Sequence, residues 1–297
     1  MQELIQTLAT GLSQGALYGL LAVAIVLPWR VSNVAPFCQG TLGMCAAFLA
    51  YFTVGSTFGA GVATLVAVLF GIGFTSAAYL GVVAFSSPSV RTTEAGHINL
   101  VMRTFGLDIV LLAIAGSLWA EKEPYRFPSL VPAGSFGAGD VKVSTAALCV
   151  LVFVLVAVTV LHLLFARTRV GLRLQAVAEN PTNAELIGVS PAMTAFIARA
   201  VAGGLAALAA VLYTPFTYLT TGMMVAFLLK AFAAILLGGR DSWFGVLLGG
   251  LLLGVLESFV GNYLSYLWQP ALAFVVITLV LVLRPQGLFA HAAASRV

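Results

Sequence analysis

Uncharged apolar runs close to 20 residues long recur along almost the whole chain. A helix needs about 20 consecutive apolar residues to cross the hydrocarbon core of a bilayer. Of the 297 residues, 61% are hydrophobic and 8% are charged, whereas a soluble domain of this length needs far more polar surface. The sequence therefore predicts an all-α membrane protein, a polytopic bundle of about nine transmembrane helices, with about eight to ten possible. The expected spans are 5–27, 37–54, 60–85, 99–119, 144–165, 194–214, 223–239, 244–261 and 268–283.

No polar block or linker divides these runs, so we expect a single transmembrane domain over 1–297. The formal charge of +4 comes from cations that are scattered singly and form no patch, so no nucleic-acid partner is expected. Lys and Arg concentrate in the cytoplasmic loops of membrane proteins. If the polar segment 167–193 is cytoplasmic, most cations lie on its side, which predicts an outside N-terminus and a cytoplasmic C-terminus. The inner set is Arg30, Arg91, Arg103, Arg167, Arg169, Arg173, Arg240, Arg284 and Arg296, and the outer set is Lys122, Arg126 and Lys142.

Two expected spans carry glycines about one helical turn apart. Such a stripe is smooth, so that the backbone of another helix approaches closely. The alternative is that the stripes reflect only the general abundance of glycine in membrane helices. The packing candidates are Gly11, Gly15 and Gly19 in the first span and Gly245, Gly249, Gly250 and Gly254 in the eighth.

Four ionisable residues lie inside expected spans. Inserting such a side chain at the centre of a membrane helix costs about 2.5–3.5 kcal/mol of free energy, so it normally has a partner or faces water. Arg199 lies about a turn from the end of its span, so we expect its side chain to snorkel to the headgroups. Lys230 and Glu257 are expected to form an ion pair that either fixes the helix register or lines a solute pathway. Asp108 either binds the amino group of a solute or accepts a hydrogen bond from a neighbour.

No set of residues suggests catalysis or metal binding. The three histidines are far apart in the expected topology, and the three cysteines lack CxxC or Cys/His spacing. The chain contains no Gly-Lys dipeptide and therefore no P-loop. We expect a chain that is not an enzyme, and any ATP must be used by another polypeptide.

Two polar segments separate the expected spans. Segment 120–143 is rich in proline and glycine and is expected to form an ordered extracytoplasmic loop able to meet a soluble partner. In segment 167–193, Asn180 followed by Pro181 predicts a helix start, Gly188 a helix stop, and Ser190 the next start. This pattern predicts two short helices joined by a bend at the membrane surface.

The chain resembles a known family at several motifs that occur in the same order. Segment 167–191 is similar to the coupling loop of ABC importer permeases. Further runs are similar to the branched-chain amino acid ABC transporter permease family. The chain resembles the H-type inner-membrane permease subunit of that family over nearly its whole length. These runs are 36–40, 104–107, 228–239, 245–257 and 284–289.

The resemblance implies a multi-pass subunit of the bacterial cytoplasmic (inner) membrane. Such a subunit pairs with a second permease, homologous or identical, and receives solute from an extracytoplasmic solute-binding protein. It binds two ATP-binding cassette subunits, which carry ATP and Mg, while this chain binds no cofactor and is surrounded by membrane lipid. Alternating access then moves the solute. The residues expected to couple to the ATPase are Arg169, Gly171, Arg173, Ala178, Glu179, Asn180, Glu185 and Gly188.

One motif departs from the family pattern. Where the family has Asn-Phe-Ala-His-Gly, this chain has Pro-Phe-Cys-Gln-Gly, so Gln39 replaces a titratable histidine. The solute is therefore expected to be a branched-chain amino acid or a related small polar solute such as an amide, urea or a small organic acid. Gln39 joins Asp108, Lys230 and Glu257 as a candidate pathway residue. The alternative is an ATP-independent secondary transporter or channel that uses the last three as ion sites.

Overall fold

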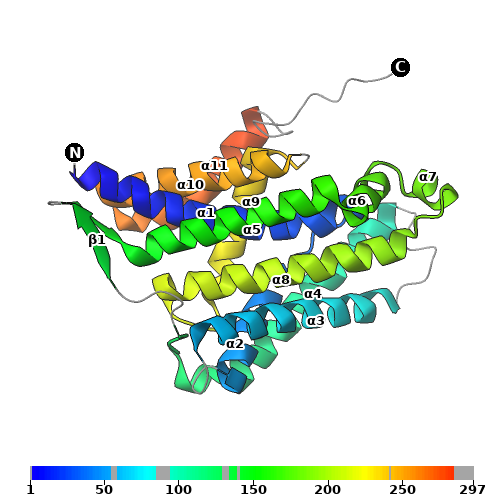
Figure 1. Ribbon diagram of the computed structural model, residues 1–297, viewed down its shortest axis with the longest axis horizontal. Coiled ribbons are helices and arrows are strands. Elements are labelled where there is room, and N and C mark those ends of the chain that lie inside the picture. Colours follow the sequence, from blue (N-terminus) through cyan, green and yellow to red (C-terminus); the bar gives the residue numbers. More distant parts are fainter. Residues whose placement is uncertain are drawn as a thin grey trace. The chain divides into compact units, whose positions relative to one another are not determined.

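The computed structural model describes residues 2–54, 59–84, 94–128, 134–138, 141–240 and 242–283, which are mainly helical (Figure 1). The 284–289 motif, Arg91, Arg296 and parts of the expected outer loop lie outside the described residues. The long helices are α1 (Gln2–Ser32), α2 (Gln39–Val54), α3 (Ala60–Ala84), α4 (Glu94–Trp119), α5 (Thr145–Arg167), α8 (Pro191–Thr217), α9 (Met223–Gly238), α10 (Trp243–Tyr263) and α11 (Gln269–Leu283).

Each expected span coincides with one of these long helices. Six helices of the described chain are long and apolar enough to cross a membrane, whereas α9 and α11 are shorter apolar helices and α2 has 16 residues. The helical membrane class is confirmed, because buried apolar helices satisfy their own backbone hydrogen bonds in lipid. The count of nine crossings stays a prediction.

The segment after α4 contains two short strands that the sequence analysis did not predict. A 3₁₀ turn, η2 (Ala120–Lys122), follows α4. Strands β1 (Ser135–Ala138) and β2 (Val141–Ser144) then pair antiparallel, with Ser135 opposite Ser144. The prolines and glycines correctly excluded a long helix here. They also interrupt the alternation of apolar and polar residues by which so short a hairpin could be recognised.

The polar segment between α5 and α8 forms two short helices, α6 (Arg169–Glu179) and α7 (Pro181–Leu186). Asn180 caps α7, since its Oδ1 accepts from the Asn183 amide at 3.0 Å. Ser190 caps α8 by accepting from the Met193 amide at 3.4 Å. Gly188 adopts a φ of 81°, which glycine reaches without steric cost. The predicted helix starts and the predicted stop are confirmed.

The chain forms two compact units, whose boundaries fall within α1, α5 and α9. Unit 1 comprises Met1–Val23, Ala133–Val154 and Leu229–Val297, and unit 2 comprises Ala24–Pro132 and Leu155–Leu228. A second 3₁₀ turn, η3 (Tyr266–Trp268), connects α10 and α11 in unit 1.

Glycines hold the helices of unit 1 together. In Figure 1 α1 and α10 lie side by side, and a Cβ added to Gly15 would lie 2.7 Å from the carbonyl oxygen of Gly250. A Cβ on Gly11 would lie 2.9 Å from the Val255 Cα. On another face of α10, a Cβ on Gly249 would lie 2.8 Å from the Gly238 nitrogen in α9. The two stripes therefore bring three helix backbones into close contact.

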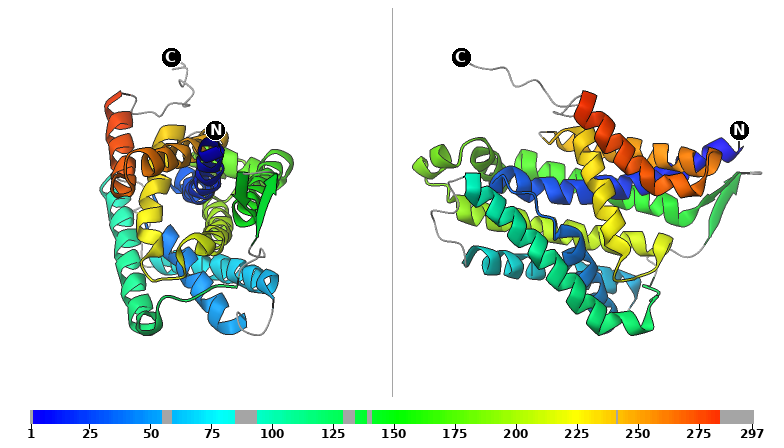
Figure 2. Two further views of the ribbon diagram at one scale, coloured as in Figure 1. Left: turned by 90° about the vertical axis from the view of Figure 1, so that its left-hand side faces the viewer. Right: turned by 180° about the vertical axis from the view of Figure 1, so that it is seen from behind.

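Unit 2 is built on α2, α3, α4 and α8. Gly43 of α2 faces the backbone of Ala206 in α8, and α4 packs across α2 (Figure 2, right-hand view). The non-helical link between α1 and α2 is also part of this interior, because Val34, Pro36 and Cys38 are buried. The buried amide and carbonyl groups of this link therefore need hydrogen-bond partners inside the protein.

Candidate functional site

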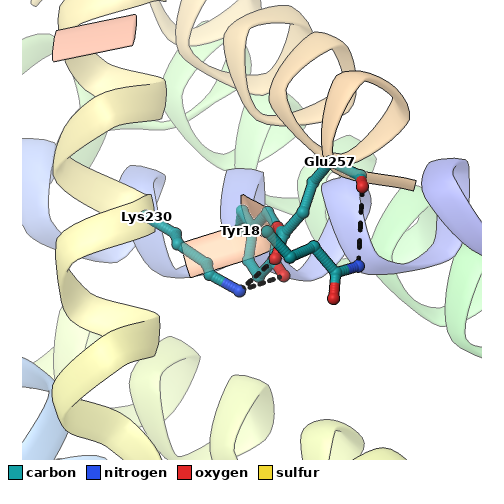
Figure 3. A network of polar contacts seen from close by, with 4 residues as sticks. Tyr18, Lys230 and Glu257 are labelled. Atoms are coloured by element: carbon teal, nitrogen blue, oxygen red, sulfur yellow. Dashed lines mark hydrogen bonds and ion pairs between the residues drawn. The ribbon is translucent and has the colours of Figure 1, made fainter. Parts of the chain in front are cut away.

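Two charged side chains of unit 1 lie in consecutive helices and contact each other. Lys230 of α9 and Glu257 of α10 form an ion pair and a hydrogen bond (Figure 3). Their side chains are 14% and 4% exposed, respectively. The ion pair expected from the sequence is therefore present, and it is largely withdrawn from solvent.

A tyrosine completes this network. The Lys230 ammonium also donates to the Tyr18 hydroxyl of α1 at 3.2 Å and lies 5.2 Å from the centroid of that ring. Gln269 of α11 donates to the main-chain oxygen of Glu257 at 3.5 Å. Four helices thus meet at one ionic contact, and the pairing fixes both charges in place because separating them would strand a carboxylate inside the bundle.

The other two candidate pathway residues lie in unit 2. Gln39 begins α2 and is 1% exposed, and its Nε2 makes no hydrogen bond. Asp108 of α4 interacts with the Thr41 hydroxyl of α2, while its buried Oδ1 has no hydrogen-bond partner. The sequence-predicted residues therefore form two groups, one paired in unit 1 and one with unused hydrogen-bonding capacity in unit 2.

Arg199 belongs to the unit 2 group, and its side chain is directed at protein groups. Its Nη2 donates to the Ser32 hydroxyl at 3.1 Å, and its guanidinium carbon lies 4.4 Å from the centroid of the Tyr79 ring. Its Nε is buried without a partner. The expectation of a snorkelling side chain was wrong, because residues far away in the sequence supply partners that position along the span could not indicate.

The α6–α7 segment in unit 2 presents both charged and apolar side chains to its surroundings. Arg169, Arg173, Glu179, Asn180 and Glu185 are exposed, whereas Ala178 is half-buried. Gly171 is instead buried against the backbone of Phe165, where a Cβ would clash, so its immediate role is to seat α6 against the end of α5.

Sequence reasoning missed the exposed apolar residues of this segment. Leu186 and Ile187 are 82% and 74% exposed, and Leu172 is exposed as well. Beside them, Arg173, Gly188 and Met193 contribute to a groove of about 160 Å³. The helical repeat of 3.6 residues could have predicted that Leu172 is exposed, because Leu172 lies on the face of α6 opposite the buried Leu174 and Val177. Contiguous exposed apolar side chains mark interaction surfaces.

Unit 1 also contains an open cleft where α1 begins and α10 ends. It has a volume of about 540 Å³ and is lined by Glu3, Gln6, Thr10, Ser144 and Tyr263, among others. The Asn262 amide donates to the Thr7 hydroxyl at 2.7 Å beside it. The cleft contains none of the residues predicted to line a solute pathway.

The long apolar helices and the ion pair buried among them are typical of a helical membrane protein. The family model for the permease component of branched-chain amino acid transport systems matches residues 7–284. The chain belongs to this family, and its resemblance at the sequence level is confirmed.

Similar proteins carry the same designation. The chain is 26% identical over 314 residues to the high-affinity branched-chain amino acid transport system permease protein BraD of Pseudomonas aeruginosa, covering 99% of this chain and 98% of BraD. It is 24% identical over 308 residues to LivH of Escherichia coli K12, covering 99% and 97% of the two chains. These relatives are permease subunits and not enzymes.

Two further similarities are to a permease named for another solute and to a solved structure. The autoinducer 2 import system permease protein LsrC of Salmonella choleraesuis is 27% identical over 264 residues, covering 86% of this chain and 70% of LsrC. A solved structure described as an inward-facing metal-chelate type ABC transporter has a TM-score of 0.51 at 18% identity, covering 94% of this chain and 87% of that one. The latter similarity concerns the fold alone.

Proposed function

We propose that this chain is the membrane-spanning subunit of an ABC importer that moves a branched-chain amino acid or a related small polar solute into the cell. It pairs with a second permease, which is identical or homologous, and two separate ATPase subunits drive it by alternating access. A solute-binding protein delivers the solute on the outer side, where the N-terminus and segment 120–143 lie. The C-terminus is cytoplasmic. The family membership supports this assignment, since BraD and LivH are named for branched-chain amino acid transport.

The observation that carries the coupling to an ATPase is the surface of α6 and α7. Leu186 and Ile187 are exposed within a segment that is otherwise polar. Two consecutive exposed apolar side chains beside charged groups suit a partner with an apolar groove and a polar rim. The caps at Asn180 and Ser190 hold the segment rigid, so that a partner's movement is transmitted to α5 and α8.

An ATP-independent transporter or channel is the second candidate. It would use Asp108, Lys230 and Glu257 as ion sites. Because Lys230 and Glu257 pair with each other, a permeating ion would have to compete with a buried partner of the same charge. This pairing favours the ATP-driven importer.

Gly188→Val tests the coupling. Valine at a φ of 81° is strained by about 1–2 kcal/mol, which changes the bend after α7 but leaves the membrane helices folded. We expect ATP hydrolysis to continue while solute uptake falls, measured on the purified complex in vesicles. Glu179→Trp, which places bulk on the same surface, should act in the same direction.

Gly222→Ala is the matched control, because a Cβ there meets no atom within 4 Å. Full ATP-driven uptake by both the Gly188 and the Glu179 variants would contradict the coupling role. Uptake by the chain alone, without ATP and abolished by an uncoupler, would favour the second candidate.

A further inference from the structure

The open cleft of unit 1 lies at the ends of three membrane helices. Its lining comes from the start of α1, the start of α5 and the end of α10. In Figure 1 the start of α1 lies beside the hairpin that leads into α5. Each of the three helices is long and apolar enough to cross a membrane. Because the ends of such helices lie at the level of the lipid headgroups, the cleft is within reach of a headgroup.

A polar stripe of α1 forms one wall of the cleft. Glu3, Gln6, Thr7 and Thr10 line it, and their spacing places them on one face of the helix. The Thr7 hydroxyl donates to the main-chain oxygen of Glu3 at 2.6 Å, and the Thr10 hydroxyl donates to that of Gln6. Since both hydroxyl protons are used inside the helix, the two oxygens can only accept further hydrogen bonds. With the Glu3 carboxylate they make this wall rich in acceptors.

The charge of the cleft is negative and unpaired. Of the described residues that line it, Glu3 alone is charged, and its carboxylate forms no ion pair within that part of the chain. The Asn262 amide of α10 donates to the Thr7 hydroxyl at 2.7 Å, which fixes α10 to this wall and leaves the Thr10 oxygen open. An unpaired carboxylate beside an open acceptor suits a cation with several N–H donors. A primary ammonium has three such donors, whereas a quaternary ammonium has none.

The wall formed by α10 continues into an apolar surface. Tyr263 lines the cleft, and its ring stacks on that of Phe259 with the centroids 5.7 Å apart. Leu256 and Leu252 lie about two and three helical turns before Tyr263, on the same face of α10. Both leucines are exposed. This face therefore offers acyl chains an apolar path along the membrane span, directly below the cleft.

We propose that the cleft binds a phospholipid whose headgroup ends in a primary ammonium. The ammonium binds the Glu3 carboxylate and the Thr10 hydroxyl oxygen. The Gln6 amide and the Tyr263 hydroxyl are donors for the phosphate, and the acyl chains lie along the exposed leucines of α10. The inference goes beyond the proposed function, because the ligand is a component of the membrane and not the transported solute.

The test measures lipid binding to the full-length chain, purified in detergent, by native mass spectrometry. The probes are phosphatidylethanolamine, phosphatidylcholine with the same acyl chains, and free ethanolamine. We expect the first lipid to bind at least about twofold to fivefold more tightly than the second, since an exposed ion pair contributes about this factor. A large excess of ethanolamine should not displace it, because the buried apolar area of the acyl chains supplies much of the affinity.

Glu3→Gln should lower the affinity for phosphatidylethanolamine to that for phosphatidylcholine and leave the latter unchanged. Thr10→Val should act in the same direction. Both side chains are exposed, so neither change should unfold the chain. Glu121→Gln is the matched control, because it removes an exposed acid in the segment after α4, outside the cleft.

Equal affinities of the wild type for the two lipids, or an unchanged preference in Glu3→Gln, would overturn the proposal. Displacement of the lipid by ethanolamine would overturn it as well, since the cleft would then bind a soluble amine. None of these measurements involves ATP or uptake, so the proposed function is tested separately.

Discussion

Replacing Lys230 by methionine should destabilise the protein more than removing both partners of its ion pair. Methionine keeps the length of the side chain but leaves the Glu257 carboxylate, which is 4% exposed, without its cation. Breaking a buried pair in this way costs about 3–5 kcal/mol. In the double variant Lys230→Met with Glu257→Gln no charge remains, and a buried neutral amide costs about 1–3 kcal/mol. The double variant should therefore recover roughly 2 kcal/mol relative to the lysine variant.

The asymmetry of the network adds a second expectation. After Glu257→Gln, Lys230 still contacts the hydroxyl and the ring of Tyr18, and a lysine that is 14% exposed keeps part of its hydration. Glu257→Gln should thus be milder than Lys230→Met. Stability is measured by reversible unfolding in mixed micelles for the wild type, both single variants and the double variant. A double variant as unstable as the sum of the single ones would refute the direct coupling of the two charges.

Two further outcomes follow from packing and exposure. Gly15→Val should destabilise the contact between α1 and α10 by about 2–4 kcal/mol or abolish folding. Gly61→Val should be tolerated, because a Cβ at Gly61 meets no atom within 4 Å. Size-exclusion chromatography distinguishes the two variants, since only the tolerated one should keep a monodisperse peak. Ile187→Asp should weaken association with the ATPase subunit at least about tenfold and leave the melting temperature of the isolated chain unchanged, whereas an unaltered yield of copurified ATPase would contradict this.

The sequence predicted the helices of this protein because lipid imposes a simple length rule. The third, seventh and ninth spans were expected at 60–85, 223–239 and 268–283, and the helices are Ala60–Ala84, Met223–Gly238 and Gln269–Leu283. Helix caps such as Asn180 were also predictable, since a cap depends on residues three positions away. The hairpin at 135–144 was not, because its strands are four residues long and depend on pairing with each other.

The candidate sites were predictable only in part. A lysine and a glutamate at similar depth in consecutive apolar spans indicate a pair, because each needs a partner and few are available. Arg199 gave a different result: its nearness to a helix end suggested the headgroups, but Ser32 and Tyr79 lie more than 100 residues away in the sequence. Its partners depend on how the helices pack, which the sequence of one span does not contain.

The same reasoning explains why the glycines and the unpaired polar groups lie in different kinds of environment. Where Gly15 meets Gly250, the helix backbones touch and leave no room for a side chain or a solute. Around Gln39 the backbone leaves the helical path, and each interruption frees amide and carbonyl groups that need partners. Close glycine contacts therefore belong to tightly packed helix crossings, whereas the Gln39 Nε2 atom is buried without a hydrogen-bond partner where the chain passes from α1 to α2.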